Sequence, residues 1–178
     1  SLPATLTPST LTPPPAALTS AATPAGFAAR ILETLETTGP LSAWNSGDPG
    51  AAEVRDYYAA RNFEPIWTDR RGPKMRARSL RAAILSAAED GLEPSDYMAP
   101  AIEALFDTTD EAGLARLETA LAWAYVRLAS DLASGRTTPN EVDPELYVHP
   151  HAIEPAAELA KAATVDDVGP LIQGHARR

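Results

Sequence analysis

An apolar stripe with the spacing of an α-helix runs from Thr109 to Gly135. Leucine or tyrosine recurs there at steps of three or four residues, which places these side chains on one helix face. We expect Thr109 to cap this helix and Gly135 to end it. Asp110 and Glu111 suit its positive end. The stripe consists of Leu114, Leu117, Leu121, Tyr125, Leu128 and Leu132.

The apolar residues elsewhere also follow helical spacing, and runs of alternating β-branched residues are absent. Breaks fall at Gly39-Pro40, Pro65 and Gly91. We therefore predict an all-α domain without a sheet, either a helical bundle or an orthogonal helical array. The other expected helices cover 27–35, 49–64, 73–89 with Ala77, Leu80, Ile84 and Ala88 inward, 101–106, 152–163, and a short one that starts at 164–167.

Residues 1–24 contain no charged residue and repeat TLTP at 5–8 and 10–13. This composition gives extended, polyproline-like chain. We expect a Pro/Thr-rich spacer at 1–24 and one helical domain at 25–178, which is long enough to bury a core. Such spacers are common just after an export signal or a membrane anchor, so we expect an exported protein whose signal or anchor lies outside these residues.

The charge and the residue usage exclude several classes of protein. A formal charge of −9 and a pI of about 4.8 argue against nucleic-acid binding, which needs a basic surface. The absence of cysteine excludes disulfides, thiolate metal ligands and a cysteine nucleophile. No run of roughly 18 apolar residues is present, so we expect no membrane span. No cofactor is expected either.

Three histidines, His149, His151 and His175, lie in what we expect to be C-terminal loops. The first two flank a proline and, with Glu145 or Glu154, offer donors for a divalent metal. Two histidines around a proline in a loop usually face solvent, and H-E-x-x-H, G-x-S-x-G and S-x-x-K are missing. We therefore expect neither a metal site nor a hydrolase triad.

Glu118 is the sharpest candidate for acid catalysis, because it lies beside the apolar stripe. An unpaired carboxyl there would have a raised pKa, which suits a general acid that cleaves a glycosidic bond. The favoured interpretation is a structural ion pair with Arg61, Arg127 or Arg136. The carboxylates considered for a glycan-cleaving pair are Asp90, Asp96, Glu118 and Asp131.

Six of the 15 basic residues fall within positions 70–81. They lie at the start of a predicted helix, where each positive charge opposes the helix dipole by a few tenths of a kcal/mol. They either answer an anionic partner or form a solvated face that the chain's own acids neutralise, and both interpretations stay open. This set, the basic cluster, is Arg70, Arg71, Lys74, Arg76, Arg78 and Arg81.

The segment YYAARNFEPIWTD at 57–69 holds Tyr57, Tyr58, Phe63 and Trp67, in a chain that is only 6% aromatic. Each of these side chains can bury on the order of 150–250 Å². We expect them to lock a corner of the core, with a groove for glycan or peptide as the alternative. RAAILSAAEDGLEPSDY follows at 81–97, and LETALAWAYVRLASDLASGR at 117–136.

In this order and spacing, the three segments resemble the N-terminal scaffold domain of the large murein L,D-transpeptidases of Gram-negative bacteria. The resemblance covers roughly residues 28–170. The residues that carry it include the expected structural positions Tyr57, Tyr58, Arg61, Asn62, Pro65, Trp67, Gly91, Leu92, Pro94, Asp96, Tyr97, Glu118, Asp131, Leu132, Gly135 and Arg136.

The resemblance implies a non-catalytic role, because the family's separate catalytic domain carries a Ser-His-Gly-Cys motif that this chain lacks. It implies an exported periplasmic protein of the transferase class, acting in peptidoglycan cross-linking and cell-wall remodelling. The implied partner is the catalytic domain of the parent chain, with peptidoglycan or an envelope protein as candidates for contact through the basic cluster. Two alternatives stay open: a stand-alone envelope module that binds another protein, and a glycan-cleaving enzyme that uses Glu118.

Overall fold

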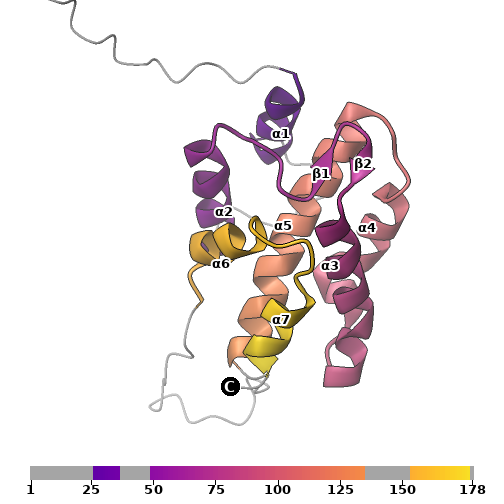
Figure 1. The fold of residues 1–178 in the computed structure, drawn as a ribbon, viewed down its shortest axis with the longest axis vertical. Coiled ribbons are helices and arrows are strands. Elements are labelled where there is room, and N and C mark those ends of the chain that lie inside the picture. Colours follow the sequence, from indigo (N-terminus) through magenta and orange to yellow (C-terminus); the bar gives the residue numbers. More distant parts are fainter. Residues whose placement is uncertain (1–25, 37–48, 135–152, 177–178) are drawn as a thin grey trace, which may run out of the picture.

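The structure is a computed structural model that describes residues 26–36, 49–134 and 153–176 (Figure 1). Helices form nearly all of the elements in these residues, which confirms the all-α prediction. The predicted spacer, the breaks at Gly39-Pro40 and Gly135, the motif residue Arg136, and the histidines His149 and His151 all lie outside the described residues.

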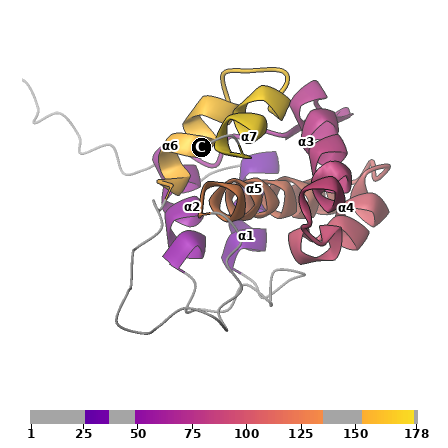
Figure 2. The ribbon, with the colours of Figure 1, turned by 90° about the horizontal axis from the view of Figure 1, so that it is seen from below.

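The long central helix α5 (Glu111–Ser134) organises the fold. Figure 2 shows α5 in the middle of the molecule, with the other helices around it. The helices that surround it are α1 (Phe27–Glu36), α2 (Pro49–Ala60), α3 (Met75–Ser86), α4 (Ala99–Leu105), α6 (Pro155–Ala162) and α7 (Gly169–Ala176). Within the described ranges, no helix has both the length and the apolar character that a membrane span requires.

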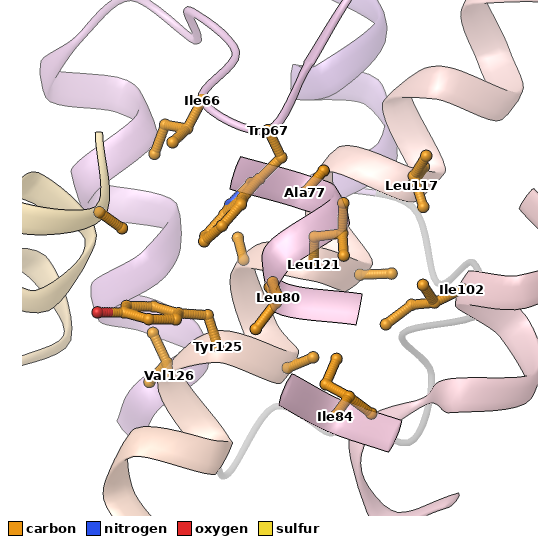
Figure 3. Packing of buried hydrophobic residues seen from close by; sticks show 14 of the residues in the cluster. Ile66, Trp67, Ala77, Leu80, Ile84, Ile102, Leu117, Leu121, Tyr125 and Val126 are labelled. Carbon is orange, nitrogen blue, oxygen red and sulfur yellow. The ribbon is translucent and has the colours of Figure 1, made fainter. Parts of the chain in front are cut away.

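The predicted apolar stripe on α5 lies in the hydrophobic core. Five of its six side chains are buried, and Leu132 packs partly buried against the same cluster. Figure 3 shows Leu117 and Leu121 among side chains from α3 and α4, with Tyr125 and Trp67 further along. The surrounding helices therefore pack against α5, since each must cover its own apolar face.

The cap of α5 differs from the prediction. Asp110, not Thr109, accepts a hydrogen bond from the Gly113 backbone N–H at 3.0 Å. The Thr108 hydroxyl in turn donates to the Asp110 carboxylate. These hydrogen bonds, led by that of Thr108, lower the pKa of Asp110. A charged carboxylate one residue later satisfies a free N–H group of the first turn and also suits the helix dipole.

The third helix also departs from the prediction at its C-terminal end. The α-helix ends at Ser86 and tightens into a 3-10 turn, η1 (Ala87–Asp90). Three residues per turn replace 3.6, so the inward position moves from the predicted Ala88, which is exposed, to Ala87, which is buried. Gly91 then ends the turn with a φ of 75°, as predicted for a C-terminal glycine cap.

The helix predicted for 49–64 starts at Pro49, as expected, but ends at Ala60, five residues before Pro65. Asn62 and Phe63 follow with φ values of 59° and 58°, a left-handed conformation that no α-helix continues through. The early end frees 61–67 to cross over α5, which places Trp67 in the core.

The prediction of no sheet is wrong at one short hairpin, where β1 (Thr68–Asp69) pairs antiparallel with β2 (Gly72–Pro73). The Asp69 carboxylate accepts the backbone N–H groups of Arg71 at 2.7 Å and Gly72 at 3.2 Å. This local bonding closes the turn, and Gly72 supplies a φ of 135° that other residues rarely adopt. Two-residue strands are too short to show period-two alternation, so the sequence pattern does not indicate them.

Candidate functional site

The carboxylate of Glu118 is the most heavily bonded group in the described core. It lies on α5 with no exposed surface. Its Oε1 accepts the Tyr58 hydroxyl at 2.8 Å and the backbone N–H of Ile66. Its Oε2 accepts the backbone N–H groups of Trp67 and Thr68, each at 2.9 Å, and the Thr68 hydroxyl at 3.1 Å.

These contacts explain why a charged side chain is tolerated next to the apolar stripe. Burial raises the pKa of Glu118, and the hydrogen bonds from Ile66, Tyr58, Trp67 and Thr68 oppose that rise. The backbone N–H groups of three successive residues converge on one carboxylate, which forms a nest for an anion. Glu118 thus fixes α2 and the 66–68 segment on α5.

The structure changes both interpretations of Glu118, the ion pair with an arginine and the general acid. The predicted ion pair is wrong for two of its three candidate arginines: Arg61 contacts Tyr57 and Glu64, and Arg127 contacts Asp131. The third, Arg136, lies outside the described residues. The donors are the Tyr58 and Thr68 hydroxyls and three backbone N–H groups instead. A glycan cannot reach a carboxyl that is 0% exposed, so the geometry argues against acid catalysis by Glu118.

The aromatic side chains of residues 57–69 pack in the core, as the favoured interpretation predicted. Tyr58 and Trp67 are fully buried, whereas Tyr57 and Phe63 are partly buried against the same cluster. The Trp67 ring lies 5.4 Å from the Tyr125 ring, centroid to centroid. Figure 3 shows the Trp67 side chain extending toward Tyr125. Tyr58 and Trp67 therefore stabilise the corner from both sides of Glu118.

A second buried carboxylate, Glu158 on α6, was missed by the sequence analysis. Its Oε2 lies 3.0 Å from Nε2 of His175 on α7, and the Tyr125 hydroxyl donates to it at 3.4 Å. Lys161 donates to Oε1 at 3.3 Å. Burial raises the pKa of Glu158, but the contacts with His175 and Lys161 outweigh it, and the net pKa is lowered. A signal was present, because Glu158 is in helical register with Pro155 and Ala162, both buried.

The structure corrects the predicted location of His175. The sequence placed it in a C-terminal loop, but it lies in α7 and is 9% exposed. Its role in the structure is to pair α7 with α6 through Glu158. Among the described residues, no group of three or more histidines or acids is placed to hold a metal ion. The predicted metal alternative at His149 and His151 lies outside those residues.

Further motif residues within the described ranges also make structural contacts. The Tyr97 hydroxyl donates to Asp131 at 2.8 Å, which ties the 3-10 turn η2 (Pro94–Tyr97) to α5. Arg61 donates to the Tyr57 hydroxyl at 2.8 Å. Of the other carboxylates considered for catalysis, Asp90 and Asp96 are exposed on the two 3-10 turns.

The basic cluster divides into engaged and exposed members. Arg81 forms a bidentate pair with Glu103 at 2.6 and 2.7 Å and stacks over Phe106 at 4.5 Å. The Arg81 hydrogen bond lowers the pKa of Glu103. Lys74 and Arg76 are partly buried. The exposed members are Arg70, Arg71 and Arg78.

An apolar side chain accompanies these exposed cations. Met75 is 70% exposed. It lies three residues, about one helical turn, before Arg78, so both side chains occupy the same face of α3. The turn of the hairpin carries Arg70 and Arg71 just ahead of this helix. The surface at the start of α3 is thus both cationic and partly apolar.

Comparison with known proteins gives one result at the level of family. A family model described as "Scaffold domain" matches residues 52–177. Searches of curated proteins and of solved structures gave no significant match. The matched range begins within α2 and runs through α7, so it includes both buried carboxylates and the basic cluster. Helix α1 precedes the match but packs against α5.

Proposed function

The chain belongs to the scaffold-domain family, and from that membership we propose that it serves as the non-catalytic scaffold of an exported L,D-transpeptidase. In this role it positions a catalytic domain during peptidoglycan cross-linking in the periplasm of a Gram-negative bacterium. The family match agrees with the resemblance found in the three sequence segments.

The observation that carries the proposal is the commitment of the two buried carboxylates to internal contacts. Glu118 accepts bonds from α2 and the 66–68 segment, and Glu158 pairs with His175. Groups bonded this way hold elements in place and are not free to transfer protons to a substrate. A rigid helical body built around α5 suits a positioning function.

The exposed part of the basic cluster supports a contact with an anionic partner. Arg71 and Arg78 are exposed and have no ion pair within the described residues. Peptidoglycan peptides carry free carboxylates, which guanidinium groups bind well. The exposed Met75 on the same face adds an apolar contact that a protein partner would also use.

The lack of catalysis is tested by incubating the purified chain with a disaccharide-tetrapeptide. We expect no cross-linked product and no released D-alanine, measured by liquid chromatography and mass spectrometry. Turnover by a clean preparation would contradict the proposed role.

The contact is tested by co-sedimentation with purified peptidoglycan. We expect R71Q/R78Q to bind less, and the difference to shrink as salt rises, because exposed charges are screened. The matched control R55Q/R116Q removes the same charge from exposed positions on α2 and α5. Equal binding by the two variants would show that the basic cluster is not the contact surface.

A further inference from the structure

A groove of about 700 Å³ lies between α3 and α7, and no member of the basic cluster lines it. Figures 1 and 2 show α7 next to α3. At one end, the Ser79 hydroxyl accepts the Val168 backbone N–H at 3.0 Å, which fixes the start of α7 to α3. Beyond that contact the helices are separated mainly by small side chains, including Ala82 and Ser86, which leave the space open.

The charged side chains that line this groove are all acidic. Glu89 and Asp90 lie on η1, Asp167 precedes α7, and all three are exposed. Asp167 accepts the Gly169 backbone N–H at 2.8 Å. Glu89 and Asp90 make no ion pair within the described part of the chain. The lining contains no lysine, arginine or histidine. We call this surface the acidic groove.

The dimensions of the acidic groove decide which cation it suits. The described acids form no group that could hold a metal ion, so they are too dispersed for a point charge. The lining from Ser79 to Asp90 follows α3 and then the 3-10 turn η1. At about 1.5 Å per α-helical residue and about 2.0 Å per 3-10 residue it would span about 18 Å, which matches about three turns of a second helix. Helices commonly bind in grooves between two helices.

We propose that the acidic groove binds a basic α-helical segment of a partner protein. Arginine or lysine of that segment pairs with Glu89, Asp90 and Asp167, and its small side chains lie against Ala82 and Ser86. Arg71 and Arg78 are not among the residues that line the groove, so this site is distinct from the contact in the proposed function and does not depend on it.

The probe is a fluorescein-labelled, alanine-rich peptide of about 12 residues with arginine at every third or fourth position, which places the charges on one helix face. We expect saturable binding at low salt by fluorescence anisotropy. E89Q/D90N should weaken it by about threefold to tenfold, the range expected for two surface charge pairs. The matched control E53Q/D56N removes two exposed charges on α2 and should change it by less than about twofold.

A second variant tests the shape of the groove without changing its charge. S86W places an indole in the open space and should weaken binding, while circular dichroism shows an unchanged helical spectrum. The proposal fails if the two charge variants lose binding equally, if a glutamate version of the peptide binds as well, or if S86W has no effect. It also fails if sedimentation shows a dimer that E89Q/D90N abolishes, because the occupant would then be a second copy.

Discussion

At the scale of single residues, the described core is defined by two buried carboxylates in different environments. Glu118 accepts mainly backbone N–H groups, whereas Glu158 contacts side chains that carry or can carry positive charge. The pKa of Glu118 is raised by burial, and that of Glu158 is lowered because its contacts outweigh burial. Each carboxylate therefore responds differently to substitution and to pH.

Substituting Glu118 tests its structural role. E118Q keeps the shape but turns an NH₂ group toward backbone donors, so we expect the free energy of unfolding to fall by about 1–3 kcal/mol. Y58F removes one donor and should cost about 1 kcal/mol. Urea denaturation measures both. The exposed control E53Q should stay within about 0.5 kcal/mol. Unchanged stability of E118Q would contradict a structural role.

At the scale of elements, the ends of the helices depend on single residues with special conformations. Gly91 ends η1 in the left-handed region with a φ of 75°, and nothing lies within 4 Å of where a Cβ would stand. The Asp110 carboxylate caps α5 through the Gly113 N–H. The lengths of these elements are thus set by local chemistry at their ends, more than by the apolar pattern within them.

The two glycines at 91 and 174 give a matched test of this idea. G91A forces alanine into a left-handed conformation without a clash and should lower the free energy of unfolding by about 1 kcal/mol. Gly174 lies within α7, also with open space around its Cβ position. G174A should therefore leave stability unchanged or raise it by up to about 1 kcal/mol. Thermal and urea unfolding compare them, and equal effects would contradict the assigned role of Gly91.

At the scale of the whole molecule, contacts between side chains distant in sequence connect the elements around α5. Glu118 fixes α2 and the 66–68 segment, Trp67 lies against Tyr125, and Tyr125 donates to Glu158 on α6. His175 extends the chain of contacts to α7. The surface at the start of α3 is cationic, and the acidic groove runs from Ser79 along the rest of that helix to η1.

The contact between α6 and α7 predicts a pH dependence of stability. Since the pKa of Glu158 is lowered in the folded state, the unfolded chain binds more protons there, and the stabilisation is lost as pH falls. We expect the stability advantage of the wild type over E158Q to be present above about pH 5 and to shrink toward pH 3, below the ordinary glutamate pKa of about 4.3. Urea unfolding at each pH measures the difference between the two proteins. A difference that grows on acidification would contradict the sign of this shift.

The sequence by itself determined the class of the fold and the inward face of its central helix. Leu117 and Leu121 are buried where their spacing predicts, because periodicity along one helix decides which side chains share a face. Gly91 likewise predicted the end of its helical segment, and it does cap the turn η1. The sequence also marked Glu118 as unusual, because a charge beside an apolar stripe needs a partner.

Only the tertiary structure decided what those marked residues contact. The donors to Glu118 lie about 50 to 60 residues away in the chain, and three of them are backbone N–H groups that every residue except proline carries. No side-chain pattern can single out such donors. The pairing of Glu158 with His175 and the acidic groove also depend on how α6 and α7 pack. Packing brings these groups together across the chain, and local spacing carries no information about it.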